Sequence, residues 1–91
     1  MEKFVYLINS VEDYGKLISF CINKDVNVFR TYWDERDAGK RCYNIDWVKN
    51  QCHYADKSFY INEGYTICEP EFVLDSYGNY QVTPKRMIES K

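Results

Sequence analysis

The segment Lys3–Phe20, KFVYLINSVEDYGKLISF, holds a strand signal that is followed directly by a helix signal. Its first part, Lys3–Ile8, is apolar on both faces, which predicts a β-strand in the middle of a sheet. Ser10 then begins a helix, because its hydroxyl can accept a backbone N–H and Asp13, three residues later, completes a capping box. Apolar residues recur at helical spacing until the polar residues 23–25 end the helix. The segment therefore predicts one strand and one helix in direct succession.

The middle of the chain carries weaker signals. Gly15 weakens the first helix by up to about 1 kcal/mol relative to alanine, and we expect it to mark close packing on the sheet. Val26–Trp33 is rich in β-branched and aromatic residues and predicts a second strand. Asp34–Lys40 is a charged connection with room for a helical turn. Arg41–Ala55 fits either a strand or a helix, and we favour a short helix from about Asp46 to Cys52.

The last third of the chain predicts β-structure. Two pairs of strands are expected, namely Ser58–Asn62 with Tyr65–Glu69 and Phe72–Asp75 with Tyr80–Thr83. Glu63-Gly64 is a tight-hairpin signal within the first pair, Pro70 ends that pair, and residues 76–79 form a turn cluster within the second. The expected fold is α+β, a mostly antiparallel sheet with one well-defined N-terminal helix and a second short helix. We expect a single domain over residues 1–84 and a frayed basic tail over residues 85–91.

The cysteines and the one histidine offer no catalytic or metal pattern. Cys21, Cys42, Cys52 and Cys68 contain no C-x-x-C pair and match no zinc spacing. We expect them to be free, buried thiols in a cytoplasmic protein, because neither a signal peptide nor a bilayer-spanning run is present. His53 follows Cys52 directly, and adjacent side chains diverge, which places the two poorly for a nucleophilic pair. The sequence predicts no enzyme, no cofactor and no metal.

Acidic residues are concentrated in the second half of the chain. Residues 50–84 hold five acids and one base, a charge of −4, whereas residues 1–49 hold eight of each. Such a surface favours a protein partner, because nucleic acid and anionic membranes repel carboxylates. The candidate partner-binding residues are Asp56, Glu63, Glu69, Glu71 and Asp75, with Glu12, Asp13, Asp34, Glu35 and Asp37 as extensions. The alternative interpretation is an ordinary solvent-exposed sheet face, and strand alternation alone does not decide which acids share a face.

A second hypothesis is a small nucleic-acid-binding regulator. Lys40, Arg41, Tyr43 and Trp47 could form a basic-aromatic surface on which bases stack. The net charge of −2 and the absence of a known nucleic-acid-binding signature argue against this hypothesis. The scarcity of leucine, independently, leads us to expect a homodimer that completes a small core.

Two stretches carry a resemblance to a known family. They are Lys3–Phe20, quoted above, and Arg41–Cys68, RCYNIDWVKNQCHYADKSFYINEGYTIC. The chain resembles small early proteins of T-even-type bacteriophages and, among these, the Arn-type anti-restriction proteins. The resemblance implies a dimeric DNA mimic that presents carboxylates in place of phosphates and inhibits the McrBC restriction nuclease in the host bacterial cytoplasm. Mimics of duplex DNA are far more acidic than −2, so any mimicry by this chain is expected to be local.

Overall fold

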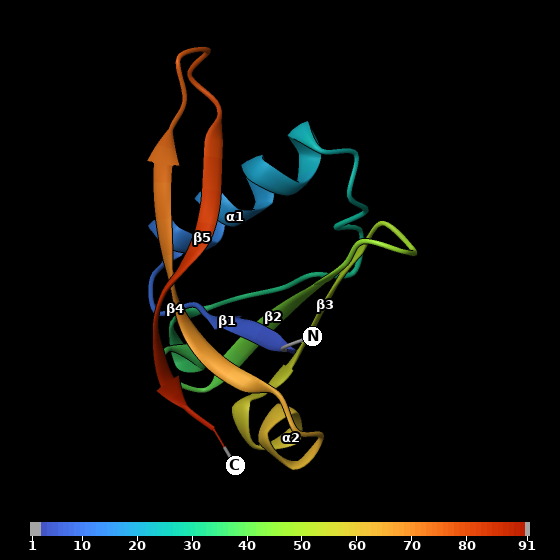
Figure 1. Cartoon of the computed structure of the whole chain (residues 1–91), viewed down its shortest axis with the longest axis vertical. Helices are drawn as coiled ribbons and strands as arrows, with labels where there is room; N and C mark the ends of the chain where they lie inside the picture. Colours follow the sequence, from blue (N-terminus) through green and yellow to red (C-terminus); the bar gives the residue numbers. More distant parts are fainter. Residues whose placement is uncertain (1–2, 91) are drawn as a thin grey trace.

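The computed structural model describes residues 3–90, which form a five-stranded sheet with helices on both of its faces (Figure 1). The elements are β1 (Phe4–Leu7), α1 (Val11–Asn23), the 3-10 helix η1 (Glu35–Asp37), β2 (Arg41–Asp46), β3 (Gln51–Asp56), α2 (Lys57–Asn62), β4 (Thr66–Leu74) and β5 (Tyr80–Glu89). The strand order is β3-β2-β1-β4-β5, and only the β1–β4 pair is parallel. The predicted α+β class with a mostly antiparallel sheet is confirmed, and the first predicted strand is the central one.

Helix α1 begins at the residue that the sequence indicates. Ser10 is extended, and its side-chain oxygen accepts the N–H of Asp13 at 3.1 Å. The helix ends at Asn23, and Asp25 leaves it with a φ of 59°. Gly15 does not pack closely on the sheet, because a Cβ added there would meet no atom within 4 Å. The predicted helix is therefore confirmed, and the reason expected for its glycine is wrong.

Alternation along β1 divides the buried side chains between two layers. Tyr6 and Ile8 belong to the core beneath α1, which we call the α1 core. Val5 and Leu7 point to the opposite face and share a second core with Tyr60 of α2, the α2 core. A strand that is apolar on both faces is therefore covered on both faces.

The predicted strand Val26–Trp33 is an irregular loop. Its sheet-like contact is a single parallel bridge between Asn27 and Gln51, at the edge of β3. Trp33 is buried in the α1 core, where its Nε1 donates to the carbonyl of Ile8 at 3.0 Å. Strand propensity fails in this segment because the apolar residues at its two ends are buried against α1 rather than in a ladder.

The predicted helix from Asp46 to Cys52 is also wrong, because β2 and β3 form an antiparallel hairpin there. Asp46 Oδ1 accepts the N–H groups of Val48 at 3.0 Å and Lys49 at 3.1 Å. Asn50 completes the turn with a φ of 53°, a conformation that asparagine tolerates better than most residues. The strand alternative left open for this region is the one that forms.

Ser58–Asn62 lies in α2 and is not a strand. Tyr60 is buried in the α2 core, and the N–H of Tyr65 donates to its carbonyl at 2.9 Å. Gly64 follows the end of the helix with a φ of 86°, a conformation that glycine adopts freely. Glu63 and Gly64, which were predicted to form a hairpin turn, therefore follow the end of a helix instead.

Strands β4 and β5 form a long hairpin that projects beyond the rest of the sheet (Figure 1). The predicted turn at residues 76–79 joins them. Pro70 does not end β4, since it lies opposite Pro84 beside a register shift. Proline is tolerated there because β1 pairs with β4 only as far as Cys68. The tail expected to be frayed from residue 85 is instead paired with β4 as far as Glu89.

Candidate acidic interface

Glu69 and Glu71 lie on the same face of the sheet. On β4, Ile67 is buried in the α2 core, whereas Phe72 packs against the α1 core. Because side chains alternate along a strand, Glu69 and Glu71 point to the α2 face together with Ile67. The structure thereby brings together two of the candidate acids whose faces the sequence left open.

Strand β5 brings positive charge to the same face. Arg86 Nε lies 2.6 Å from Glu69 Oε2, and Lys57 Nζ of α2 lies 3.1 Å from Glu89 Oε2. Residues 50–84 carry a charge of −4, but extending the window to residue 90 adds two bases and one acid and brings the charge to −3. Pairing with β5 therefore reduces the local acidity that the sequence indicates.

Asp75 stabilises the hairpin turn instead of extending the acidic surface. Its Oδ1 accepts the N–H groups of Tyr77 at 2.8 Å and Asn79 at 3.0 Å, and its Oδ2 accepts Gln81 Nε2 at 3.0 Å. The backbone hydrogen bond from Asn79, with smaller effects of Tyr77 and Gln81, lowers the pKa of Asp75 below its usual value. The hydrogen bonds of the turn therefore stabilise the ionised carboxylate of Asp75.

Three of the candidate acids around α2 and β4 have no cationic partner, and we call Asp56, Glu63 and Glu71 the α2–β4 strip. Asp56 and Glu63 flank α2, whose six residues span about 9 Å, and Glu71 is exposed on β4. Within residues 3–90, none of these carboxylates makes an ion pair or a hydrogen bond. Arg41 lies opposite Asp56 in the β2–β3 ladder, yet it pairs with Asp37 instead.

The five acids expected as extensions lie at the start of α1 and around η1. Asp34 caps η1, and hydrogen bonds from Arg36 and from the Tyr32 hydroxyl lower its pKa to about 2. Asp37 accepts the N–H of Asp34 at 3.0 Å and lies 3.3 Å from Arg41. In the described part of the chain, the extension acids without an ion pair are Glu12, Asp13 and Glu35.

The four residues expected to form a basic-aromatic surface do not come together. Tyr43 is fully buried, and its hydroxyl donates to the carbonyl of Tyr32. Arg41 pairs with Asp37, and its Cζ lies 4.8 Å from the centre of the Tyr54 ring. Trp47 is exposed beyond the far end of β2, roughly 20 Å of strand away from Arg41. Bases could not stack on this set as one platform.

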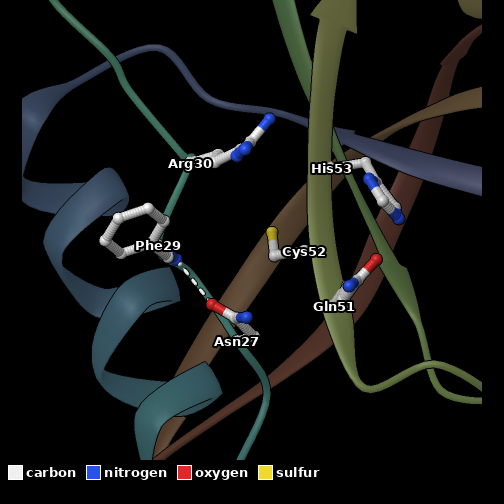
Figure 2. A pocket seen from close by; sticks show the side chains of 6 residues that line it. All are labelled: Asn27, Phe29, Arg30, Gln51, Cys52 and His53. Carbon is white, nitrogen blue, oxygen red and sulfur yellow. Dashed lines mark hydrogen bonds between the residues drawn. The ribbon is translucent and has the colours of Figure 1, made fainter.

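A pocket of about 420 Å³ opens at the edge of β3 (Figure 2). It is lined by Asn27, Phe29, Arg30, Gln51, Cys52 and His53, and none of these is an acid. Figure 2 shows the Cys52 sulfur and the His53 ring on opposite sides of β3, so the adjacent pair diverges as expected. All four cysteines are buried, as the sequence analysis predicts.

A larger groove of about 810 Å³ opens on the α1 side of the sheet. Phe20 of α1, the β2–β3 turn with Trp47 and Val48, and Val82 of β5 contribute to its walls. Sequence reasoning missed this groove because it assigned the turn to a helix. Trp47 and Val48 of this turn are 55% and 94% exposed, which the sequence alone does not indicate.

Comparisons with known proteins identify no relative of this chain. No family model, no curated protein and no solved structure matches the chain. Within residues 3–90, no group of three histidine, cysteine, aspartate or glutamate side chains is placed to hold a metal ion. No helix in the same range is both long and apolar enough to cross a membrane. The geometry of the α+β domain is therefore the basis for a functional proposal.

Proposed function

We propose that the protein is a non-enzymatic inhibitor that binds a nucleic-acid-processing protein, of the restriction-nuclease kind, through the α2–β4 strip. Each carboxylate of the strip takes the place of a phosphate in a cationic groove of the partner. One observation supports this most strongly. Three cations on neighbouring elements, Arg41, Lys57 and Arg86, are each paired with an acid outside the strip. A fourth, Lys3, donates from its Nζ to the backbone carbonyl of Glu63 at 3.3 Å, so the three carboxylates make no ion pair within residues 3–90 but Glu63 has a cation beside it.

The size of the charge limits the mimicry to a few phosphates. A DNA duplex as long as the longest dimension of the protein, 37 Å, carries on the order of 20 phosphates. The whole chain has 14 acids, which are opposed by 12 bases. The strip therefore imitates a short stretch of backbone and not a duplex.

Cleavage of DNA that contains modified cytosine by purified McrBC nuclease tests this proposal. The wild-type protein is expected to inhibit cleavage, and the triple variant Asp56→Asn, Glu63→Gln, Glu71→Gln to inhibit it less. Exposed ion pairs contribute about 0.2–1 kcal/mol each, so three of them change the inhibition constant by roughly 3- to 150-fold. None of the three substitutions removes a hydrogen bond or an ion pair within residues 3–90.

A matched triple variant separates the strip from the overall charge. Glu12→Gln, Asp13→Asn and Glu35→Gln remove the same charge at the start of α1 and at η1, and we expect inhibition close to that of the wild type. Equal weakening by the two triples would assign the effect to net charge. A wild-type protein that neither inhibits McrBC nor forms a complex with it at low salt would overturn the proposal.

We extend the proposal to a homodimer that acts in the bacterial cytoplasm. Strand β5 is a ten-residue edge of the sheet, and the β4–β5 hairpin exposes Val73, Leu74, Met87 and Ile88. Edge strands that carry apolar side chains pair readily with another chain. Light scattering should report about twice the 11.0 kDa of one chain, and a monomer at micromolar concentration would contradict the dimer.

A further inference from the structure

The β4–β5 hairpin ends in an arm, residues 73–81, that carries apolar side chains away from the rest of the sheet (Figure 1). Tyr77 at its tip is 88% exposed, and Val73 and Leu74 are each more than half exposed. The backbone at the tip is fixed, because Asp75 Oδ1 accepts the N–H of Tyr77 at 2.8 Å. Within residues 3–90, the Tyr77 ring lies beside no other aromatic ring. A well-ordered turn thus presents an aromatic side chain to solvent.

The groove on the α1 side of the sheet is a concave surface on which such a side chain fits. Its volume is about 810 Å³, and six aromatic residues line it, namely Phe4, Tyr6, Phe20, Tyr43, Trp47 and Tyr65. Trp47 is oriented by an edge-on contact with Phe20, with 6.0 Å between the ring centres, and 55% of Trp47 remains exposed. Lys3 and Asp46 add polar groups to the lining. A tyrosine suits this groove, because its ring packs on aromatic walls while its hydroxyl bonds to a polar group.

The arm of one chain does not fill the groove of the same chain. Val82 lines the groove at the base of the arm, and Tyr77 lies five residues before it, at most about 17 Å of strand away. Because Tyr80 is paired with Leu74 across the hairpin, the tip cannot fold back onto Val82. The tip and the groove are therefore two separate apolar surfaces, and both are uncovered in the single chain.

We propose that two copies of the chain form a dimer in which each arm occupies the groove of the other. This exchange rests on the dimer proposed above and names the surfaces that hold it together. A tip that contacts Val82 of the second copy sets the two arms antiparallel and side by side. The same two-fold rotation places the second tip in the first groove, so the assembly closes after two chains.

The area buried by this exchange is that of a small, specific interface. One arm exposes roughly 200–350 Å² of apolar side chain, since an aromatic side chain buries about 150–250 Å² and an aliphatic one roughly 60–120 Å². Two arms and the two groove surfaces that face them then bury roughly 800–1,400 Å² in total, before any contact between the arms themselves. Specific interfaces bury about 1,200–2,000 Å². The total reaches the lower part of this range, so we expect a reversible dimer.

Concentration-dependent light scattering of the full-length protein tests the exchange, with Tyr77→Ala for the arm and Val48→Glu for the groove. Val48 is 94% exposed beside Trp47, so neither substitution disturbs the core. Loss of an aromatic anchor weakens a complex by about 5- to 30-fold, and here the loss occurs twice, so the dissociation constant of Tyr77→Ala should rise by roughly 30- to 900-fold. Phe29→Ala removes an 86% exposed ring at the edge of β3, outside both surfaces, and should leave the constant unchanged.

A mixture of the two variants distinguishes exchange from any other mode of pairing. Each variant alone forms dimers with two damaged contacts, whereas a heterodimer of Tyr77→Ala with Val48→Glu joins one intact arm to one intact groove. The mixture should therefore contain more dimer than either variant alone at the same total concentration.

An affinity that neither substitution changes, a mixture without this gain, or equal weakening by Phe29→Ala would overturn the exchange. A wild type that stays monomeric up to millimolar concentration would overturn it together with the dimer. The acidic strip is judged separately, because Glu71 points to the α2 face and the groove opens on the α1 side. Tyr77→Ala should therefore still inhibit McrBC, and loss of inhibition by the wild type alone decides against the proposed function.

Discussion

Replacing Arg86 with glutamine should make the protein a tighter binder of a cationic partner. Arg86 Nε holds Glu69 Oε2 at 2.6 Å, on the face that also carries Glu71. The substitution removes one positive charge and releases one carboxylate, so the α2–β4 strip gains a fourth member. An exposed ion pair contributes about 0.2–1 kcal/mol, which predicts a dissociation constant lower by about 1.4- to 5-fold. A variant that loses structure would bind more weakly. Tighter binding after removal of a cation therefore cannot be attributed to misfolding.

The fold should tolerate this change. The Arg86 side chain is 73% exposed, so loss of its ion pair lowers the free energy of unfolding by at most about 1 kcal/mol. Inhibition of McrBC at low and at moderate salt measures the binding, and circular dichroism checks the fold. The gain should shrink as salt rises, because screening weakens exposed charges.

Arg30→Gln is the matched control for this experiment. It removes the same charge from the loop beside β3, at the opposite edge of the sheet, and within residues 3–90 Arg30 makes no ion pair. Arg86→Gln with unchanged or weaker inhibition, in a folded protein, would refute the role of the strip. An equal gain from Arg30→Gln would show that net charge alone controls binding.

Two further predictions concern stability. Gly15→Ala should raise the free energy of unfolding by up to about 1 kcal/mol, because alanine favours the helix interior and the added Cβ meets no atom within 4 Å. Urea denaturation measures this, and an unchanged or lower value would contradict the geometry around α1. Asp75 has a pKa lowered in the folded state, so its charge stabilises the fold above about pH 4, and this contribution is lost as the pH falls through the lowered pKa. The stability difference between the wild type and Asp75→Asn should therefore shrink on acidification, and a difference that is constant with pH would argue against the turn contacts.

The elements that sequence reasoning identified correctly are those with local signals. Ser10 and Asp13 fix the start of α1 by a contact three residues apart, and residues 76–79 contain the turn that joins β4 and β5. Lys3–Ile8 is apolar on both faces because both faces are covered. In the first two cases, the residues that form the structure are neighbours in the chain. In the third case, the apolar pattern along the strand directly indicates that both of its faces are buried.

The elements that were missed depend on distant residues. Ser58–Asn62 is helical because Tyr60 is buried against strands that lie elsewhere in the chain, and nothing within the segment indicates that partner. Val26–Trp33 has strand propensity, but Trp33 donates to the carbonyl of Ile8, 25 residues earlier. Local propensity could not have predicted either contact, because both are set by the packing of the whole domain.

The acidic surface predicted from the charges along the sequence is only partly present, for the same physical reason. Residues 85–89 are separate from the acidic window in the sequence, but β5 runs antiparallel to β4 and places Arg86 directly opposite Glu69. The acidic excess of a 35-residue window is thereby reduced to three unpaired carboxylates around α2 and β4. Three exposed charges contribute at most about 3 kcal/mol to binding, less than half of the free energy that micromolar affinity requires. Any tight partner must therefore gain the remainder from further contacts, and if these are not ionic, moderate salt should weaken the complex without abolishing it.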